Sequence, residues 1–155
     1  MHRDQSPLRA RSTPEHLPPL LLDTDQMLDE FTRLPVRAEF RFDPAMPAVI
    51  TVEFLAERGP SLIWRLGREL LHGGLSTMSG CGDVRMWPAQ SDERLSSWLL
   101  LETPEIEALF ELPTGPLEVW LDATYRIAPA GSELAGIDWD GFLRGLLERP
   151  GAPSE

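Results

Sequence analysis

The sequence lacks the features of secreted and membrane proteins. Its single cysteine cannot form a disulfide within the chain, which is typical of proteins from a reducing compartment. No apolar run approaches the roughly 20 residues that a membrane-spanning helix needs. The first 19 residues contain arginines and four prolines but no apolar segment of the kind that a secretory signal carries. These absences predict a cytoplasmic protein that does not insert into a membrane.

Positive charge is also scarce and unevenly distributed. Lysine is absent, and three arginines against two acids give residues 1–17 a net charge of +1, which leaves −12 for the rest of a chain whose total is −11. The interval between Arg94 and Arg126 has no basic residue and contains six acids: Glu102, Glu105, Glu107, Glu111, Glu118 and Asp122. We interpret this interval as a solvated face, or as a surface that docks on a basic patch of a partner. Such charge argues against nucleic acid and anionic lipid as partners.

The chain is predicted to form one domain between two flexible ends. Residues 1–19 have the proline content and scattered charge of a disordered lead, and residues 150–155 resemble a flexible tail. Residues 20–149 then form a single domain, which is large enough to bury a core without disulfides or metal.

Alternation of apolar and polar residues predicts strands that pair as hairpins. In "LPVRAEFRFDP" (34–44) the apolar residues alternate with charged ones, which is typical of a half-buried strand that ends at Asp43-Pro44. The β-branched run at 48–57 is its expected hairpin partner. Further strand-like segments lie at 61–66 (a strand or the entry to a helix), 83–88, 94–103 and 106–113, the last two joined by a turn at 103–105.

Three other segments have helical patterns. Residues 67–75 end at Gly73-Gly74, a C-terminal signal, and residues 113–129 carry apolar side chains at helical spacing. Asp138 precedes an amphipathic closing helix at 139–149. Because strands and helices do not alternate as βαβ units, we predict an α+β fold, in which a curved antiparallel β-sheet packs with two to three helices and the last helix closes the chain.

The stretch "GCGDVRMWP" (residues 80–88) raises the question of chemistry. A phosphate-binding loop needs glycines that lead into a helix, usually with a lysine behind them, whereas a strand-like alternation follows here. We interpret the stretch as structural. Its glycines permit a tight or left-handed turn, which Asp83 can hold by bonding to backbone amides.

The strand after this turn has two distinct faces. Val84, Met86 and Pro88 point to one side, and Asp83, Arg85 and Trp87 point to the other. The second face is either a salt-bridged sheet face or part of a binding surface, because arginine and tryptophan are enriched among interface anchors. The candidate interaction or structural motif is Gly82, Asp83, Val84, Arg85, Trp87 and Pro88. The other four tryptophans fall on apolar stripes and are predicted to be core residues: Trp64, Trp98, Trp120 and Trp139.

No catalytic, metal or cofactor site is predicted. A nucleophilic Cys81 would need His72 as its base, and nothing in the spacing favours that dyad over an inert buried cysteine. One cysteine and one usable histidine cannot fill a structural zinc site without carboxylates, and the acids at 102–122 lack the pattern of a calcium loop.

Several of these pieces, in this order, resemble the SsgA-like family of actinobacterial sporulation and cell-division proteins. They are "LPVRAEFRFDP", "WRLGRELLHGGL", "GCGDVRMWP", "ETPEIEALFELP" and the stretch through "APAGSE" to the closing helix, which together run from about Leu34 to Leu147. The "GDVRMWP" string is the most distinctive. The longer lead, Gly67 in place of a typical alanine, and "DPAMPAV" in place of a tyrosine-bearing turn indicate a divergent member.

The resemblance implies a non-enzymatic regulator or adaptor of sporulation-specific cell division, in septum placement or in spore-wall and peptidoglycan remodelling. It implies concentration at the division septum and protein partners, either the tubulin-like ring protein FtsZ or a paralogous SsgA-like protein. It also implies a homotrimer, and a barrel or sandwich of curved sheets similar to the "whirly" proteins that bind single-stranded nucleic acid. That likeness raises single-strand binding as the alternative function, with the five tryptophans as stacking platforms, although the acidic charge argues against it.

Overall fold

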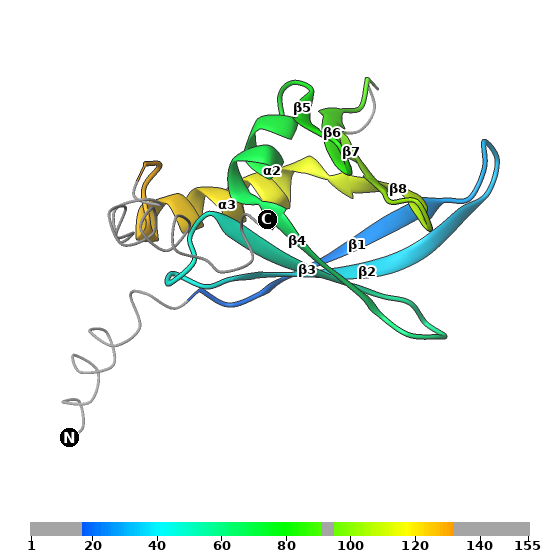
Figure 1. The fold of residues 1–155 in the computed structure, drawn as a ribbon, viewed down its shortest axis with the longest axis horizontal. Helices are drawn as coiled ribbons and strands as arrows, with labels where there is room; N and C mark the ends of the chain where they lie inside the picture. The colour runs from blue at the N-terminus through cyan, green and yellow to red at the C-terminus, as the bar shows by residue number, and fades with distance from the viewer. Residues whose placement is uncertain (1–16, 91–94, 132–155) are drawn as a thin grey trace, which may run out of the picture.

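The computed structural model describes residues 17–90 and 95–131, apart from the side chain of Cys81. This part of the chain forms a curled antiparallel sheet of eight strands with two helices (Figure 1). The elements are β1 Leu20–Met27, β2 Arg33–Phe42, β3 Val49–Leu55, β4 Leu62–Gly67, α2 Arg68–Gly74, β5 Ser79–Cys81, β6 Val84–Pro88, β7 Ser96–Glu102, β8 Glu107–Pro113 and α3 Thr114–Ile127.

The strand order in the sheet is β4-β3-β2-β1-β8-β7-β6-β5. Strands that follow each other in the chain pair as hairpins within each half, and β1 pairs with β8 to join the two halves. The sheet curls strongly, because the rings of Phe54 on β3 and Phe110 on β8 stack with centroids 4.1 Å apart although two strands separate them in the sheet. The result is a half-barrel with an inner and an outer face.

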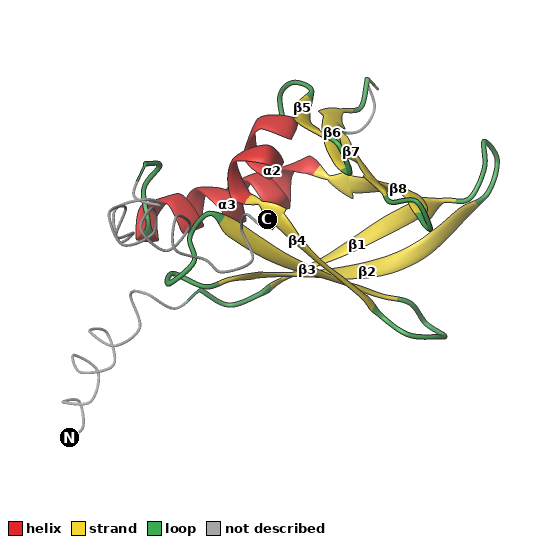
Figure 2. Ribbon diagram, in the orientation of Figure 1, coloured by secondary structure: helices red, strands yellow, loops and turns green. Residues whose placement is uncertain are grey.

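The core lies on the inner face. Each strand turns its alternate apolar residues inward, as in β3, where Ile50, Val52 and Phe54 are buried between more exposed neighbours. Both helices lie together at one end of the curled sheet, away from the tip of the β1–β2 hairpin (Figure 2). From α3, Leu117 and Leu121 join the core, and from α2, Leu71 does so. Neither helix in these ranges has the length and apolar character that crossing a membrane requires.

Most of the predicted elements are confirmed. The strands at 34–42 and 48–57, the strands at 94–103 and 106–113 with their turn, and the helices at 67–75 and 113–129 all form near their expected bounds. The segment at 61–66 forms a strand, β4, and not the entry to a helix. The predicted closing helix at 139–149 and the tail at 150–155 lie outside the described residues.

Strand β1 was not predicted. Its sequence "LLLDTDQM" opens on three leucines and therefore shows no alternation at its start, yet Leu22 and Thr24 are buried while Leu21 and Asp23 are exposed. Just before it, the indole N–H of Trp120 on α3 donates a hydrogen bond of 2.9 Å to the carbonyl of Pro18. Residues 1–16 of the predicted lead lie outside the described part.

Candidate functional site

The glycine-rich stretch forms the hairpin between β5 and β6. Gly80 and Gly82 both have positive φ, +102° and +67°, as the predicted left-handed turn requires. A side chain on Gly80 would meet the carbonyl oxygen of Val84 and, at 2.8 Å, Leu70 of α2. The turn is fixed by backbone, since the carbonyl of Asp83 accepts a 2.8 Å hydrogen bond from the amide of Glu102. Across the described residues the Asp83 carboxylate forms no hydrogen bond with the turn.

The next residues alternate between the two faces of the sheet. Met86 is fully buried on the inner face, against Gly74 of α2. Arg85 and Trp87 point to the outer face, where Arg85 Nη2 lies 3.2 Å from Glu102 Oε1 on β7. Val84 and Pro88 are half-buried. The outer face therefore combines the two features left open by the sequence, an ion pair and an accessible tryptophan.

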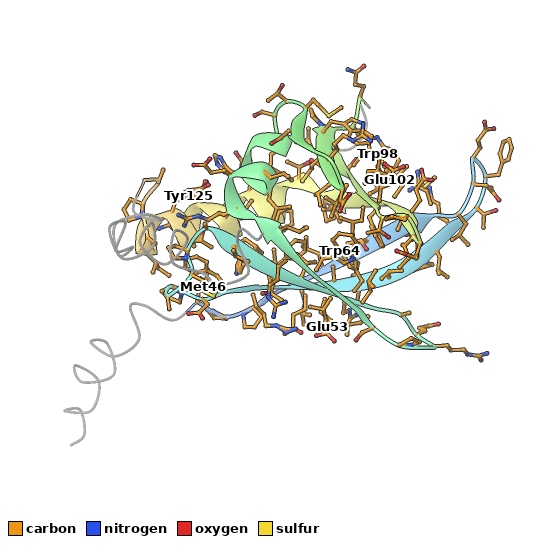
Figure 3. The ribbon with its side chains drawn as sticks, viewed as in Figure 1. Met46, Glu53, Trp64, Trp98, Glu102 and Tyr125 are labelled. Carbon is orange, nitrogen blue, oxygen red and sulfur yellow. The ribbon has the colours of Figure 1, made fainter. Side chains whose placement is uncertain are left out.

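Trp87 belongs to a larger apolar surface on the outer face. It lies directly opposite Trp98 on β7 in the strand register. Two residues further along β7, on the same face, Leu100 lies opposite Arg85 of β6 and opposite Leu109 of β8. Leu109 in turn lies opposite Met27 of β1. We call these half-buried side chains the outer cluster: Trp87, Trp98, Leu100, Leu109 and Met27. Figure 3 shows Trp98 beside Glu102, on the same strand and face.

The structure corrects one tryptophan prediction. Trp98 is half-buried in the outer cluster and not in the core. The prediction failed because the run "WLLL" shows no alternation that would tell which residues face inward. Trp120 is buried and Trp64 packs against the core, as predicted. Trp139 lies outside the described residues.

An ion pair with a buried carboxylate and a partly exposed arginine lies next to the outer cluster. Glu111, opposite Trp98 in the register, is 8% exposed. Its carboxylate accepts hydrogen bonds from the hydroxyl of Ser96 at 2.6 Å and from the guanidinium of Arg33 at 2.5 Å. Arg33 also lies 3.4 Å from Asp25. The hydrogen bond with Glu111 raises the pKa of Arg33 above its usual value.

This ion pair corrects the expectation that the acidic interval is wholly solvated. Glu111 belongs to that interval and is nevertheless enclosed, with a counter-charge that comes from 78 positions away in the chain. The sequence shows an interval without basic residues, whereas the pairing of β1 with both β2 and β8 brings Arg33 across to it.

Arg68 is a second buried charged residue that the sequence did not reveal. Its side chain is fully buried at the start of α2, with the guanidinium carbon 3.9 Å from the ring centroid of Tyr125 and 5.5 Å from that of Phe42. It also donates a hydrogen bond of 3.1 Å to the carbonyl of Thr124. These contacts join α2 to α3. The signal that could have found it is its helical spacing from the buried Leu71.

His72 contacts α3 as well. Its Nε2 lies 3.6 Å from Asp122 Oδ1, and its ring meets that of Tyr125 edge-on with centroids 5.1 Å apart. These residues line a depression of about 640 Å³ between the helices. The Cys81 side chain is not described, so the Cys81–His72 alternative is not tested. Within the described ranges no three metal-ligating side chains are grouped closely enough to hold an ion.

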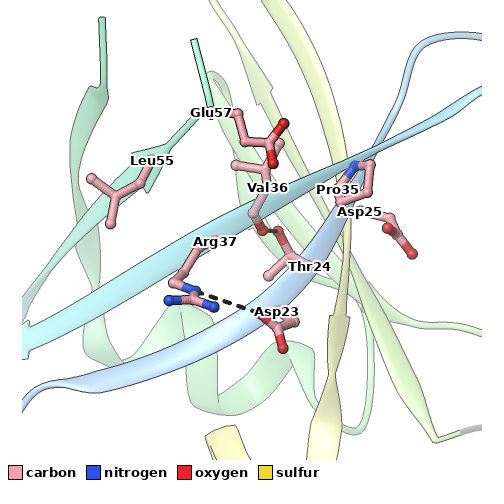
Figure 4. Close-up of a pocket in the computed structure, with 8 residues that line it drawn as sticks. All are labelled: Asp23, Thr24, Asp25, Pro35, Val36, Arg37, Leu55 and Glu57. Atoms are coloured by element: carbon pink, nitrogen blue, oxygen red, sulfur yellow. Dashed lines mark hydrogen bonds and ion pairs between the residues drawn. The ribbon is translucent and has the colours of Figure 1, made fainter.

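A second depression, of about 460 Å³, lies on the outer side of β1, β2 and the end of β3 (Figure 4). Its walls carry three carboxylates, those of Asp23, Asp25 and Glu57, and the guanidinium of Arg37, whose Nε lies 3.5 Å from Asp23. The hydroxyl of Thr24 donates to the carbonyl of Val36 at 2.6 Å. This hydroxyl is therefore engaged in a hydrogen bond between the paired strands β1 and β2.

Comparison with known proteins connects this fold to a family. A family described as "Streptomyces sporulation and cell division protein, SsgA" matches residues 36–133. A relative from Salinispora tropica, named sporulation-specific cell division protein SsgB, is 41% identical over 118 residues, which are 75% of this chain and 82% of the relative.

Solved structures agree in fold. One, from a study of SsgB mutations that correlate with longitudinal cell division during sporulation of Streptomyces coelicolor, is similar with a TM-score of 0.71 and 33% identity, over 76% of this chain and 92% of that one. An SsgA-like sporulation-specific cell division protein from Thermobifida fusca gives a TM-score of 0.71 and 28% identity, over 81% and 92% of the two chains. The curled sheet and the sequence matches lead to one conclusion, that the chain belongs to the SsgA family of sporulation and cell division proteins.

Proposed function

We propose that the chain is a non-enzymatic adaptor in sporulation-specific cell division, which acts through protein–protein contacts in septum placement or in spore-wall remodelling. Its relatives are named sporulation-specific cell division proteins, and its family carries the same description. Those names do not say how the chain acts, and the outer face of the sheet is the feature that supports action through protein–protein contacts.

The observation that supports an adaptor is the composition of the outer cluster. Trp87 and Trp98 lie side by side and half-exposed on a sheet whose helices pack on the other face. The ion pair of Arg85 with Glu102 lies at one edge of the cluster. An apolar centre with tryptophan and a charged rim is the usual anatomy of a protein interface. The net charge of −11 opposes binding to the phosphate backbone of a single-stranded nucleic acid.

The partners are part of the proposal. On the resemblance of the sequence, we propose that the surface binds FtsZ or a paralogous SsgA-like protein, and that the chain works at the division septum on the cytoplasmic side. A homotrimer is the proposed assembly. Both partners are proteins, and the outer cluster offers the kind of surface that a folded protein recognises.

The experiment is gene deletion in the host followed by complementation. We expect deletion to displace or abolish sporulation septa, and we expect the double variant Trp87→Ala, Trp98→Ala to fold but to fail to restore them. The matched control is Val119→Ala, an exposed apolar residue on α3. Thermal melts of the purified variants show whether each one is folded.

Two outcomes would count against the proposal. A deletion strain with normally placed and normally separated spores would remove the role in division. A folded double variant that restores septation as well as the wild type would remove the outer cluster from that role.

A further inference from the structure

The loop between β1 and β2 displays the most exposed large apolar side chain of the described residues. The two strands pair without interruption from Leu20 opposite Phe40 to Met27 opposite Arg33. Residues 28–32, which we call the tip loop, follow at the far end of this hairpin, away from both helices (Figure 1). Phe31 in this loop is 90% exposed, and Leu28 beside it is 54% exposed. The fold thus buries little of the Phe31 ring, and its apolar area is accessible to a partner.

The tip loop is held in one shape by its own hydrogen bonds. The amide of Leu28 donates to the carbonyl of Thr32 at 2.9 Å, which closes the loop. The amide of Phe31 donates to the carboxylate of Asp29 at 2.7 Å. This bond, together with hydrogen bonding to Thr32, lowers the pKa of Asp29 below its usual value. The loop therefore presents its aromatic ring in a pre-organised position, which reduces the entropy that a partner must restrict on binding.

The tip loop carries two acidic residues. Asp29 and Glu30 precede Phe31 directly, and in the described ranges neither carboxylate forms an ion pair with a basic side chain. The nearest arginine in the chain, Arg33, directly follows the tip loop and is engaged with Glu111 and Asp25. The tip loop thus combines one apolar anchor with two carboxylates that have no counter-charge in this part of the structure.

We propose that the tip loop is a docking element that inserts Phe31 into an apolar pocket rimmed by arginine or lysine on a division partner. The inference rests on the proposed function and adds to it a second contact site with defined chemistry. A buried aromatic ring supplies the apolar contact area, and the basic rim neutralises Asp29 and Glu30.

Charge decides between this occupant and two others. An anionic membrane surface would repel Asp29 and Glu30. A second copy of this chain has a net charge of −11, which opposes the approach of Asp29 and Glu30, although one of its depressions is lined by Leu20, Trp120 and Arg126 without an acid. A basic protein surface is the occupant that the tip loop fits.

The test is a titration of purified full-length protein with purified FtsZ and with the SsgA-like paralogue from the same host. We expect Phe31→Ala to weaken binding to one of them by at least about 30-fold, which corresponds to the loss of an interface hot spot. Glu30→Gln should weaken binding less and reduce its dependence on salt. The matched control, Met46→Ala, removes a side chain that is 55% exposed in the β2–β3 loop and should change affinity less than about 2-fold, within the near-neutral range of non-hot-spot contacts.

Complementation of the deletion strain separates this inference from the proposed function. If folded Phe31→Ala restores septation fully, or binds both proteins as the wild type does, the docking element is wrong while the proposed function stands. Failure of the folded variant to restore septation supports it, including where neither purified protein binds the wild type. A deletion without a septation defect removes the proposed function and this inference together.

Two further measurements identify a wrong occupant. Sedimentation of the wild type and Phe31→Ala shows whether the ring mediates self-association. Flotation with vesicles of phosphatidylglycerol and phosphatidylethanolamine shows whether the ring binds lipid. A change in either caused by Phe31→Ala contradicts a basic protein pocket.

Discussion

The two faces of the sheet bury charge in different ways. The inner face encloses Arg68 against an aromatic ring and a helix carbonyl, beneath a continuous apolar core. The outer face encloses Glu111 by means of Arg33 and Ser96, while the tryptophans next to it keep part of their surface exposed. Arg68, on the inner side, connects α2 to α3 through its contacts with Tyr125 and Thr124. Glu111, on the outer side, holds Arg33 and Ser96 in place beside the outer cluster, which stays accessible as recognition of a partner requires.

Neighbouring leucines on β7 provide the largest test of this contrast. Leu99 is fully buried on the inner face, and Leu100 is half-buried on the outer face. Because truncation of a buried leucine leaves a cavity, we expect Leu99→Ala to lower the free energy of unfolding by about 3 kcal/mol. Leu100→Ala should lower it by about 1 kcal/mol. Urea unfolding followed by tryptophan fluorescence measures both, and equal losses would mean that the outer face is packed as tightly as the inner.

The two glycines of the β5–β6 hairpin sharpen the contrast at a smaller scale. A methyl group on Gly80 would collide with the Val84 carbonyl and with Leu70 of α2, whereas one on Gly82 would meet no atom within 4 Å. Both positions have positive φ. We expect Gly80→Ala to cost at least about 2 kcal/mol from strain and crowding, and Gly82→Ala about 1 kcal/mol from strain alone. Thermal melts compare the two, and a larger loss for Gly82→Ala would show that the stretch is not fixed by α2.

Two glutamates on the outer face give the smallest expected effect. Glu111 is enclosed with two hydrogen-bond donors, whereas Glu102 forms a more exposed pair with Arg85. We expect Glu111→Gln to lower the free energy of unfolding by about 1–2 kcal/mol, because the hydrogen bond from Arg33 then no longer has a charged acceptor. Glu102→Gln should change it by less than about 0.5 kcal/mol. Denaturant titrations at neutral pH make the comparison. If Glu111→Gln left the free energy of unfolding unchanged, the pairing with Arg33 would not stabilise this face.

Much of the fold could be predicted because its strands alternate cleanly. The segment at 34–42 shows this, with charged residues between every pair of inward side chains, and its hairpin with 48–57 forms as expected. Where alternation is missing, prediction fails. Strand β1 begins with three leucines, and "WLLL" in β7 hides which residues face the core, so β1 was missed and Trp98 was misplaced.

The candidate surface was predictable only in part. The sequence singled out Arg85 and Trp87 as one strand face, and the structure places them together on the outer side. It could not supply Trp98 as the neighbour of Trp87, because the sequence pattern does not set the register between β6 and β7. Nor could it supply Arg33 as the partner of Glu111, because β2 and β8 lie far apart in the chain.

The sequence by itself determined the antiparallel hairpins, the two helices and the acidic character of this chain, since periodicity and composition are local properties. Only the tertiary structure decided which acid is enclosed, which arginine is buried and which tryptophans stay accessible. The physical reason is that the strand register and the pairing of β1 with β8 set the neighbours of each side chain, and the environment of a side chain depends on those neighbours rather than on its position in the chain.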